Sequence, residues 1–595
     1  MKFGMRLITI AALTCSLILM AACGGGGDET ATPKATAAAT SSTTAPTPTT
    51  APGATAVATQ PGSGGTSVPG FTGTVLDTTK MSSYELDGIK YGGTEVFPTQ
   101  FSNALDPKLN NSGIWPDVRN EYEKLIGWKT IEGQEYLQLS PELAESWQGS
   151  ADVKTYTFNL RKGIKWQNIA PTNGRELVAD DAVFSMNRYR EKDAVNYSSY
   201  LQIESIEATD KYTVVVKLKD PNAYAVNELF SALDYVVPKE LVTSGEIISK
   251  AVGTGPFIMT KWNLRAGSSH IKNPDYWQKD AKGNRLPYVD AIEVPFITDP
   301  ATSIAAFRSG QTDVPAVGPT LDQMISLGKG GNVRVFWNGN TLTGQGFTFR
   351  VDKAPWNDIR VRRAINMMLD KTKYGDLIEG PGRWTYTGPM PWSLVSDKPF
   401  TFDDYGPWYK YDPAAAKKLL IEAGFADGKI KSPTPLAASQ GNPYGPRTAL
   451  FQAMFKEHGF EFDLQAMDFA TYNPYYFNRQ APDIALTHHI LTQPNLNWFA
   501  QNKYHPDASQ NTGHINDPEI TKMLQEIRVT TDPAKQKEYA RKIWDFDTLG
   551  SYNIWVPNAR SYAIVGSRVR NYHFRQGGTG FLVFMWLADA PRTSY

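Results

Sequence analysis

Residues 155–166, TYTFNLRKGIKW, carry the clearest structural pattern in this chain. Tyr156, Phe158 and Leu160 alternate with polar residues, and this period of two is typical of a β-strand with one buried and one hydrated face. Gly163 follows a basic pair and predicts a turn. The stretch therefore predicts a strand and a turn, and the large aromatic residue Trp166 follows the turn.

Other segments show the same alternation or a helical period. Residues 212–218 alternate as a second strand, and residues 358–369 place apolar side chains at helical spacing after Asn357 or Asp358 as the N-cap. A helix at 413–423 is predicted by Asp412 as its cap, a proline in its first turn and Gly424 as its stop. Strands and helices that alternate in this way predict the mixed α/β class.

The N-terminal residues have the pattern of a secretory signal. Lys2 and Arg6 precede an apolar run over residues 7–20, and small residues lead into Cys23. The run is shorter than the ~20 apolar residues that a membrane span needs, so we interpret residues 1–22 as a signal peptide. Of the two cysteines in the chain, Cys15 lies in the predicted signal and would be lost with it, so the mature protein is expected to have no disulfide. It also has no thiol nucleophile if Cys23 is lipidated, as a resemblance given below implies.

Residues 23–80 differ in composition from the rest of the chain. Glycine, alanine, threonine, proline and serine dominate, and no charged residue occurs between Lys34 and Asp77. Such a segment buries too little apolar area to offset the entropy of ordering, which predicts a disordered tether. About 515 residues follow, more than a single core accommodates, so two or more lobes are expected.

The net charge excludes one class of partner. Lys and Arg number 60, as do Asp and Glu, and the formal net charge is zero without a basic block. Nucleic acid is therefore not an expected partner.

Several short motifs resemble those of one family, the bacterial extracellular solute-binding proteins of family 5, which are peptide- and nickel-type receptors of ABC importers. The opening stretch resembles the family pattern F-x-L-R-x-G-x-x-W. Further motifs follow in the family's order: LDP at 105–107, LAESW at 143–147, GTGPF at 253–257, NPDYW at 273–277, PYVD at 287–290, DIRVRRAI at 358–365 and YDP at 411–413.

The resemblance implies a two-lobed α/β fold of the periplasmic-binding-protein type (type II), with an extra domain inserted in the N-terminal lobe. We expect lobe I at 81–340 with the insertion at about 115–245, lobe II at 341–545 and a return to lobe I at 546–595. The implied function is capture of a small solute of the peptide or saccharide class between hinged lobes and delivery to the membrane subunits of an ABC permease.

Residues 20–23, MAAC, also resemble a lipobox, although leucine is usual where Met20 stands. The resemblance implies lipidation of Cys23 and anchoring of the protein, as part of an ABC transporter complex, to the outer face of the cell membrane. We expect a monomer that uses no cofactor and no metal.

In family members that bind dipeptides, an aspartate holds the ligand's amino group, and the matching stretch here is 482–495. The expected carboxylates are missing, and His488, His489, Gln493 and Asn495 stand in their region. A neutral or cationic group is a poor partner for an ammonium, because it does not supply the ion pair that a carboxylate forms. We therefore hypothesise that the ligand is a saccharide or another neutral polar solute, or that a carboxylate from elsewhere replaces the aspartate.

The two histidines are adjacent, and adjacent residues on a strand point to opposite faces, which argues against a metal pair. Other candidate ligand contacts are aromatic residues near the expected cleft, together with one amide before the LDP turn. They are Trp384, Trp392, Trp498 and Asn103. Aromatic faces can stack on a sugar ring or an apolar side chain, but each tryptophan can equally be a core residue.

The alternative function is an exported hydrolase acting on a saccharide or peptide in the same cleft. It requires two carboxylates across the cleft or a nucleophile with a base. No G-x-S-x-G, H-E-x-x-H or C-x-x-C motif occurs. We interpret Asp180 and Asp181 as a helix cap and not as a catalytic pair of carboxylates. The arginines at 360, 362 and 363 are interpreted as helix-surface and salt-bridge residues and not as an anion-binding site.

Overall fold

The strand predicted at residues 155–160 is β6 of the computed structural model, and its alternation is confirmed. Tyr156, Phe158 and Leu160 are at most 4% exposed, and Gly163 has the positive φ of the predicted turn. Trp166 is buried, and its Nε1 donates to Asp181 at 3.3 Å. The antiparallel sheet runs in the order β5 (Ala144–Gly149), β6 (Thr155–Leu160), β8 (Thr213–Leu218), β7 (Ile203–Asp210).

The structure describes residues 75–77, 87–99, 104–109, 116–129, 138–194, 197–229, 234–338, 343–398, 400–439, 444–467, 471–472, 483–490, 495–559, 561–572 and 582–588. The predicted signal, Cys23 and most of the predicted tether lie outside these residues.

Short helices accompany the four-stranded sheet, and we call this part the inserted subdomain. Its helices are α2 (Ala179–Arg188), α3 (Tyr197–Tyr200) and α4 (Ala225–Leu229). The N-cap of α2 is Val178, so the two aspartates predicted as the cap lie in the first turn instead. Asp181 accepts a hydrogen bond from the backbone N of Val178 at 3.0 Å and so helps to begin the helix. One hydrophobic cluster contains Phe158 of the sheet, Ala182 of α2 and Leu229 of α4.

Two further sheets share a core and form lobe I. Phe336 and Ile292, one from each sheet, are fully buried in the same cluster. The first sheet has the order β1 (Val75–Asp77), β12 (Val333–Asn338), β22 (Ser561–Gly566), and the second has β2 (Thr94–Val96), β11 (Ala291–Pro295), β10 (Gly267–Lys272), β9 (Phe257–Asn263). Side chains of α6 (Pro300–Arg308) and α7 (Leu321–Gly328) share a hydrophobic cluster with β12 and β22, and side chains of α1 (Pro116–Arg119) and α5 (Lys239–Thr243) share one with β9.

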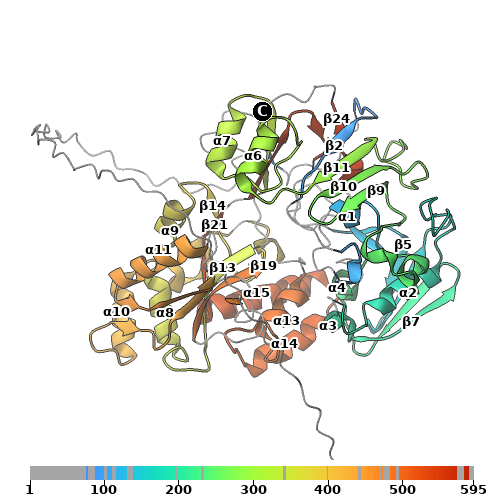
Figure 1. Ribbon diagram of the computed structural model, residues 1–595. Coiled ribbons are helices and arrows are strands. Elements are labelled where there is room, and N and C mark those ends of the chain that lie inside the picture. The colour runs from blue at the N-terminus through green and yellow to red at the C-terminus, as the bar shows by residue number, and fades with distance from the viewer. Residues whose placement is uncertain are drawn as a thin grey trace, which may run out of the picture. The chain divides into compact units, whose positions relative to one another are not determined.

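A five-stranded sheet forms the centre of lobe II. Its order is β18 (Leu464–Met467), β16 (Leu436–Ser439), β19 (Ile484–Ile490), β13 (Thr343–Phe349), β20 (Asn553–Val556). Along β20, Ile554 and Val556 join one hydrophobic cluster while Trp555 joins another, so both faces of the sheet are covered. Figure 1 shows α8, α10 and α11 on one side of the sheet and α13, α14 and α15 on the other.

These helices follow from local sequence. Asp358 caps α8 (Ile359–Met368), and Asp412 caps α10 (Pro413–Glu422), as predicted. Both carboxylates accept hydrogen bonds from backbone N–H groups that the first helical turn leaves unpaired. The other helices of the lobe are α9 (Lys371–Ile378), α11 (Tyr444–Glu457), α13 (Leu496–Tyr504), α14 (Pro518–Val529) and α15 (Pro533–Gly550).

One prediction on α8 is wrong. Arg362 was expected on the helix surface, but it is only 4% exposed. Its guanidinium donates to the backbone O of Trp356 at 2.7 Å and to that of Gly550 at 3.0 Å. Arg362 therefore ties α8 to the C-terminal end of α15, whereas Arg360 is exposed and pairs with Asp358.

Among the described elements, the chain crosses twice between the lobe I sheets and the lobe II sheet. The first crossing leads from β12 to β13, and the second from β20 to β22. β12 pairs with β22 and β13 pairs with β20, so the crossing strands are neighbours in both sheets. This arrangement joins the lobes through two adjacent strands.

Short two-stranded pairs and 3-10 helices complete the described elements. The pairs are β3 (Ile126–Lys129) with β4 (Gln138–Pro141), β14 (Trp384–Thr385) with β21 (Asn558–Ala559), β15 (Ile430–Lys431) with β17 (Phe460–Glu461), and β23 (Val569–Arg570) with β24 (Trp586–Leu587). The 3-10 helices are η2 (Pro107–Leu109), η3 (Glu246–Ile248), η4 (Trp392–Leu394), η5 (Phe402–Tyr405), η6 (Pro407–Tyr409) and η7 (Leu582–Phe584). Within the part of the chain that the structure describes, no helix has the length and apolar character of a membrane span.

Candidate functional site

The predicted histidines lie on β19, next to the first crossing. In the antiparallel pairing of β13 with β19, His488 is opposite Gln345 and His489 is opposite Gly344. β13 is the strand that the chain enters directly after it leaves lobe I. The backbone therefore places His488 and His489 at the end of the lobe II sheet where the two lobes are connected.

Asn495 begins α13, which follows β19 in the chain. Its side-chain oxygen accepts a hydrogen bond from the backbone N of Trp498 at 2.8 Å, so Asn495 is the N-cap of this helix. The residue is 5% exposed, and its buried Nδ2 has no hydrogen-bond partner among the residues that the structure describes. A buried amide N–H group without a partner is costly, so Asn495 is the predicted residue with an unused donor.

Two of the predicted tryptophans share one environment. Trp392, in η4, and Trp498, in α13, are both partly buried and pack against the cluster that contains Phe499 and Trp544. The fold thus brings Trp392, Trp498 and Asn495 into one part of lobe II. Their roles as ligand contacts remain predictions.

Trp384 has a different environment. It is 1% exposed, and its Nε1 donates to Asp376 at 2.7 Å. A Cβ on Gly375 would come within 2.8 Å of its ring, so the glycine makes room for the indole. All of these contacts are those of a packing residue. Asn103 lies outside the described residues.

The segment that follows Asp483 contains no acidic residue as far as Asp507. Asp483 itself is 5% exposed and pairs with Lys353 at 3.0 Å. It directly precedes β19 (Ile484–Ile490), whereas His488 and His489 lie at the other end of that strand. Asp483 is therefore already paired and is separated along β19 from the two histidines.

A buried polar network that the sequence did not reveal supports the second crossing. Asp547 of α15 accepts hydrogen bonds from Tyr504 at 2.7 Å, Asn553 at 2.6 Å and the indole of Trp555 at 2.8 Å. Burial raises the pKa of Asp547 and lowers that of Lys503 to about 7. The network joins β20 to α13 and α15, because Asp547 of α15 binds Asn553 and Trp555 of β20 as well as Tyr504 of α13.

The inserted subdomain also contacts lobe II directly. Asn497 of α13 donates to Glu228 of α4 at 2.9 Å, and the backbone N of Ala223 donates to the backbone O of Arg528 at 2.8 Å. Tyr224 is 6% exposed within the hydrophobic cluster of α13, α14 and α15. No sequence motif indicated this contact, because its two sides are 269 residues apart.

Lobe I contains a serine, a histidine and a glutamate in a row. Ser268 Oγ lies 2.6 Å from His270 Nε2, and His270 Nδ1 lies 2.6 Å from Glu121 Oε1. The three residues are at most 5% exposed. This geometry resembles a catalytic triad, but a hydroxyl with so little exposure is not accessible to a substrate.

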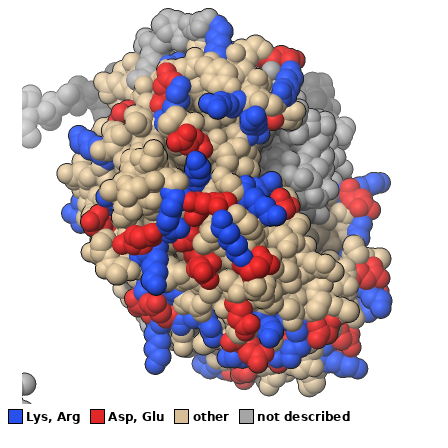
Figure 2. Space-filling view, turned by 90° about the vertical axis from the view of Figure 1, so that its right-hand side faces the viewer, with Lys and Arg blue, Asp and Glu red and all other residues tan. Residues whose placement is uncertain are grey.

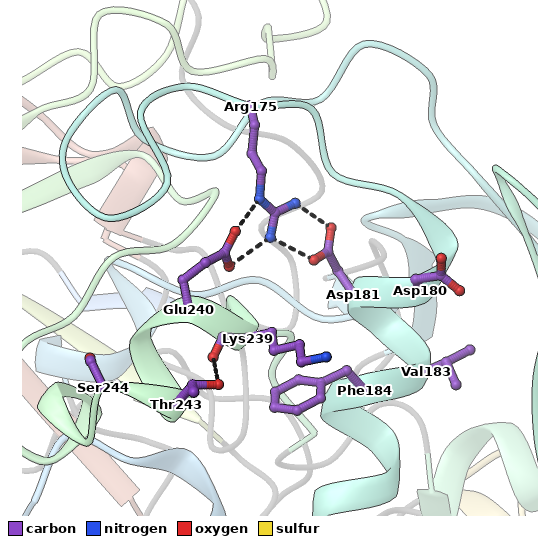
Figure 3. A pocket seen from close by; sticks show the side chains of 9 residues that line it. All are labelled: Arg175, Asp180, Asp181, Val183, Phe184, Lys239, Glu240, Thr243 and Ser244. Atoms are coloured by element: carbon purple, nitrogen blue, oxygen red, sulfur yellow. Dashed lines mark hydrogen bonds and ion pairs between the residues drawn. The ribbon is translucent and has the colours of Figure 1, made fainter.

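An open cavity of about 830 Å³ lies between α2 of the inserted subdomain and α5 of lobe I (Figure 3). Arg175 spans it and pairs with Asp181 at 2.7 Å and with Glu240 at 2.6 Å. The guanidinium donates to both carboxylates, so its charge is already compensated.

On the face shown in Figure 2, basic and acidic side chains lie intermixed. Among the described residues, no group of three or more His, Cys, Asp or Glu side chains could hold a metal ion.

Two lobes joined by adjacent crossing strands define the class of two-lobed binding proteins, in which closure about a hinge surrounds a ligand. The chain belongs to the bacterial extracellular solute-binding proteins, family 5, because the family's middle-region model matches residues 138–511. The predicted family and α/β fold are thereby confirmed.

Relatives and solved structures agree with this assignment. The chain is 31% identical over 332 residues to di/tripeptide-binding protein 2 of Pseudomonas aeruginosa, covering 52% of this chain and 59% of that relative. It is 25% identical over 518 residues to heme-binding protein A of Haemophilus influenzae, covering 80% and 88%. An ABC transporter-associated periplasmic binding protein of Helicobacter pylori, solved with peptide STSA, has the same fold, with a TM-score of 0.66, 22% identity and coverage of 84% and 98%.

Proposed function

We propose that the protein is the substrate-binding receptor of an ABC importer. It captures a small solute of the peptide or saccharide class between its lobes and delivers it to the transmembrane subunits of a permease. The observation that carries this proposal is the extent of the family match. Residues 138–511 include the inserted subdomain, the first crossing and most of lobe II, so both sides of the proposed cleft belong to the matched segment.

The ligand region favours a neutral polar solute over a peptide held by its amino group. Asp483 is paired with Lys353, and acidic residues are absent from 484–506 in the sequence. Asn495 contributes a buried donor without a partner, which suits a hydroxyl or carbonyl acceptor rather than an ammonium. Relatives named for di/tripeptides and for heme show that ligands differ within this family.

The proposed chemistry is binding and release, with no bond made or broken. The serine–histidine–glutamate row of lobe I is the arrangement nearest to a hydrolase site among the described residues, and its low exposure argues against the alternative of an exported hydrolase. Incubation with oligosaccharides or peptides and analysis of the products tests this point. Any turnover that is lost in Ser268→Ala would favour the hydrolase.

We further propose that Cys23 is lipidated and holds a monomeric receptor at the outer face of the membrane, within reach of its permease. The basis is the resemblance of residues 20–23 to a lipobox. Globomycin-sensitive processing and loss of membrane association in Cys23→Ser are the expected results. A Cys23→Ser protein that stays membrane-bound would contradict the anchor.

Ligand class is tested by isothermal titration with di-, tri- and tetrapeptides and with a panel of neutral oligosaccharides. Asn495→Asp supplies a carboxylate at the same position and keeps an equally good N-cap. We expect the wild type to bind no peptide tightly and Asn495→Asp to gain peptide affinity. Tight, pH-insensitive peptide binding by the wild type would contradict the proposal.

A further inference from the structure

The contact between the inserted subdomain and lobe II is built from several different interactions. Tyr224 inserts its ring into the hydrophobic cluster of α13, α14 and α15, and Ala223 packs at the edge of the same cluster. Asn497 donates to one carboxylate oxygen of Glu228, and Asn222 donates to the other at 3.0 Å. We call residues 222–228 the clasp.

The clasp is anchored firmly on its own side. Asn222 is 1% exposed, its Nδ2 donates to Gln202 at 2.9 Å, and its Oδ1 accepts from the backbone N of Tyr224. Tyr156 of β6 donates its hydroxyl to the backbone O of Asn222 at 2.5 Å. The inserted subdomain therefore presents Tyr224 and Glu228 from a rigid base.

No covalent connection accompanies the clasp. The chain passes between the lobes only at the β12–β13 and β20–β22 crossings among the described elements, and both lie elsewhere in the sequence. Figure 1 shows α4 beside α13, in agreement with the hydrogen bond from Asn497 to Glu228. Rotation of the lobes about the crossing strands would therefore separate the two sides of the clasp without breaking the chain.

One feature of Tyr224 indicates that the clasp is reversible. Its hydroxyl is buried and has no hydrogen-bond partner in the described part of the chain. An unpaired hydroxyl costs free energy when it is buried, but water satisfies it once the ring leaves the cluster. Tyr224 thus weakens the closed arrangement relative to phenylalanine of the same shape, which suits a contact that must open.

We propose that residues 222–228 are a reversible clasp that holds the inserted subdomain against lobe II and sets the balance between open and closed forms of the receptor. The inference rests on the proposed two-lobed receptor function, and it assigns closure energy to residues other than those that contact the ligand. Any solute that requires the closed form is bound with an affinity that the clasp adjusts, because part of the binding energy shifts the population.

Spin-label distance measurements on the full chain test the clasp without a ligand. The sequence contains only Cys15 and Cys23, so replacing both by Ser leaves a background free of thiols. Labels at Lys219→Cys and Gln525→Cys, both exposed, report the separation of the inserted subdomain from α14. Three variants are compared with this parent: Tyr224→Ala, Tyr224→Phe and, as the control in the same subdomain, Tyr212→Ala.

We expect Tyr224→Ala to raise the ratio of open to closed forms at least tenfold, which corresponds to about 1.4 kcal/mol. Tyr224→Phe should shift the ratio in the opposite direction, because it removes only the unpaired hydroxyl. Tyr212→Ala, which loses a contact with Glu176 inside the subdomain, should leave the ratio unchanged. Circular dichroism and thermal melts verify that each variant is folded.

The proposal is overturned if both Tyr224 variants keep the parent distance distribution, or if Tyr212→Ala reproduces the effect of Tyr224→Ala. Because this readout needs no solute, it is separate from the ligand titration. A clasp that responds as expected in a protein that binds none of the tested solutes would leave the clasp in place and remove only the assignment of ligand.

Discussion

The ion pair between Asp313 and Arg568 provides a quantitative test of how lobe I is held together. Asp313 follows α6, and Arg568 lies in the turn after β22, so the pair joins segments 255 residues apart. The Asp313 side chain is fully buried and that of Arg568 is 11% exposed. The carboxylate accepts from Arg568 Nε at 2.6 Å, from Nη2 at 2.7 Å and from the backbone N of Val96 at 2.8 Å.

Asp313→Ala leaves a nearly buried guanidinium without its carboxylate. Removing one partner of a buried ion pair destabilises a protein by about 3–5 kcal/mol. The Val96 N–H group loses its acceptor as well, so we expect the upper part of this range. The loss in free energy of unfolding is measured from the shift of the unfolding transition that occurs at the lowest urea concentration, monitored by circular dichroism and tryptophan fluorescence.

Asp322→Ala is the matched control. Asp322 also pairs with an arginine, Arg383, at 3.0 Å, but its side chain is 81% exposed. An exposed pair contributes no more than about 1 kcal/mol. If Asp313→Ala destabilises the protein no more than Asp322→Ala does, the argument from burial is wrong.

Three further predictions concern other buried groups. Burial lowers the pKa of Lys371 to about 7, below the ~10.4 of an unfolded chain. The unfolded state therefore binds more protons between these pH values, and this lysine makes the free energy of unfolding rise with pH by up to about 1.4 kcal/mol per unit. Lys503, whose pKa is lowered in the same way, adds a rise of its own. Lys371→Met should therefore reduce, without abolishing, the rise in stability between urea denaturation at pH 7 and at pH 9, and an unchanged slope would count against the argument. Arg362→Leu deprives two buried backbone carbonyls of their donor and should lower the free energy of unfolding by about 2–5 kcal/mol in chemical denaturation. Arg360→Leu, on the exposed face of the same helix, should lower it by less than about 1 kcal/mol. Equal losses in the two variants would refute the distinction between the buried and the exposed arginine. A Cβ on Gly253 would lie 1.7 Å from the backbone O of Glu121, so Gly253→Ala should lower the free energy of unfolding by about 1–3 kcal/mol or more through overpacking. A thermal melt like that of the wild type would contradict this prediction, because it would show that the backbone moves to make room for the methyl group.

Local sequence predicted the elements whose causes are local. The alternation of β6 and the capping aspartates of α8 and α10 act within a few residues, and the structure confirms them. The burial of Arg362 could not be predicted in this way, because its guanidinium donates to the backbone O of Gly550, which lies 188 residues further along the chain. The ordered family motifs supplied what periodicity could not, namely the two-lobed fold and the family.

The candidate site was predicted less completely, for the same reason. Asn495 was selected as a ligand contact, and the structure adds that its oxygen caps α13 while its nitrogen stays unpaired. Trp384 was selected as a stacking surface, but its space is created by Gly375, which no pattern around Trp384 reveals. The clasp escaped prediction altogether, because Tyr224 and Glu228 acquire their partners only when distant segments fold together.

Native mass spectrometry of the gently purified mature protein, followed by denaturation and identification of the released molecule, tests the central claim most directly. The protein is expected to carry one neutral polar solute, such as an oligosaccharide, in a one-to-one complex that dissociates intact on unfolding. A released mixture of peptides would contradict the assignment drawn from the absence of a carboxylate in the segment between Asp483 and Trp498 and would require a partner for the amino group elsewhere in the cleft.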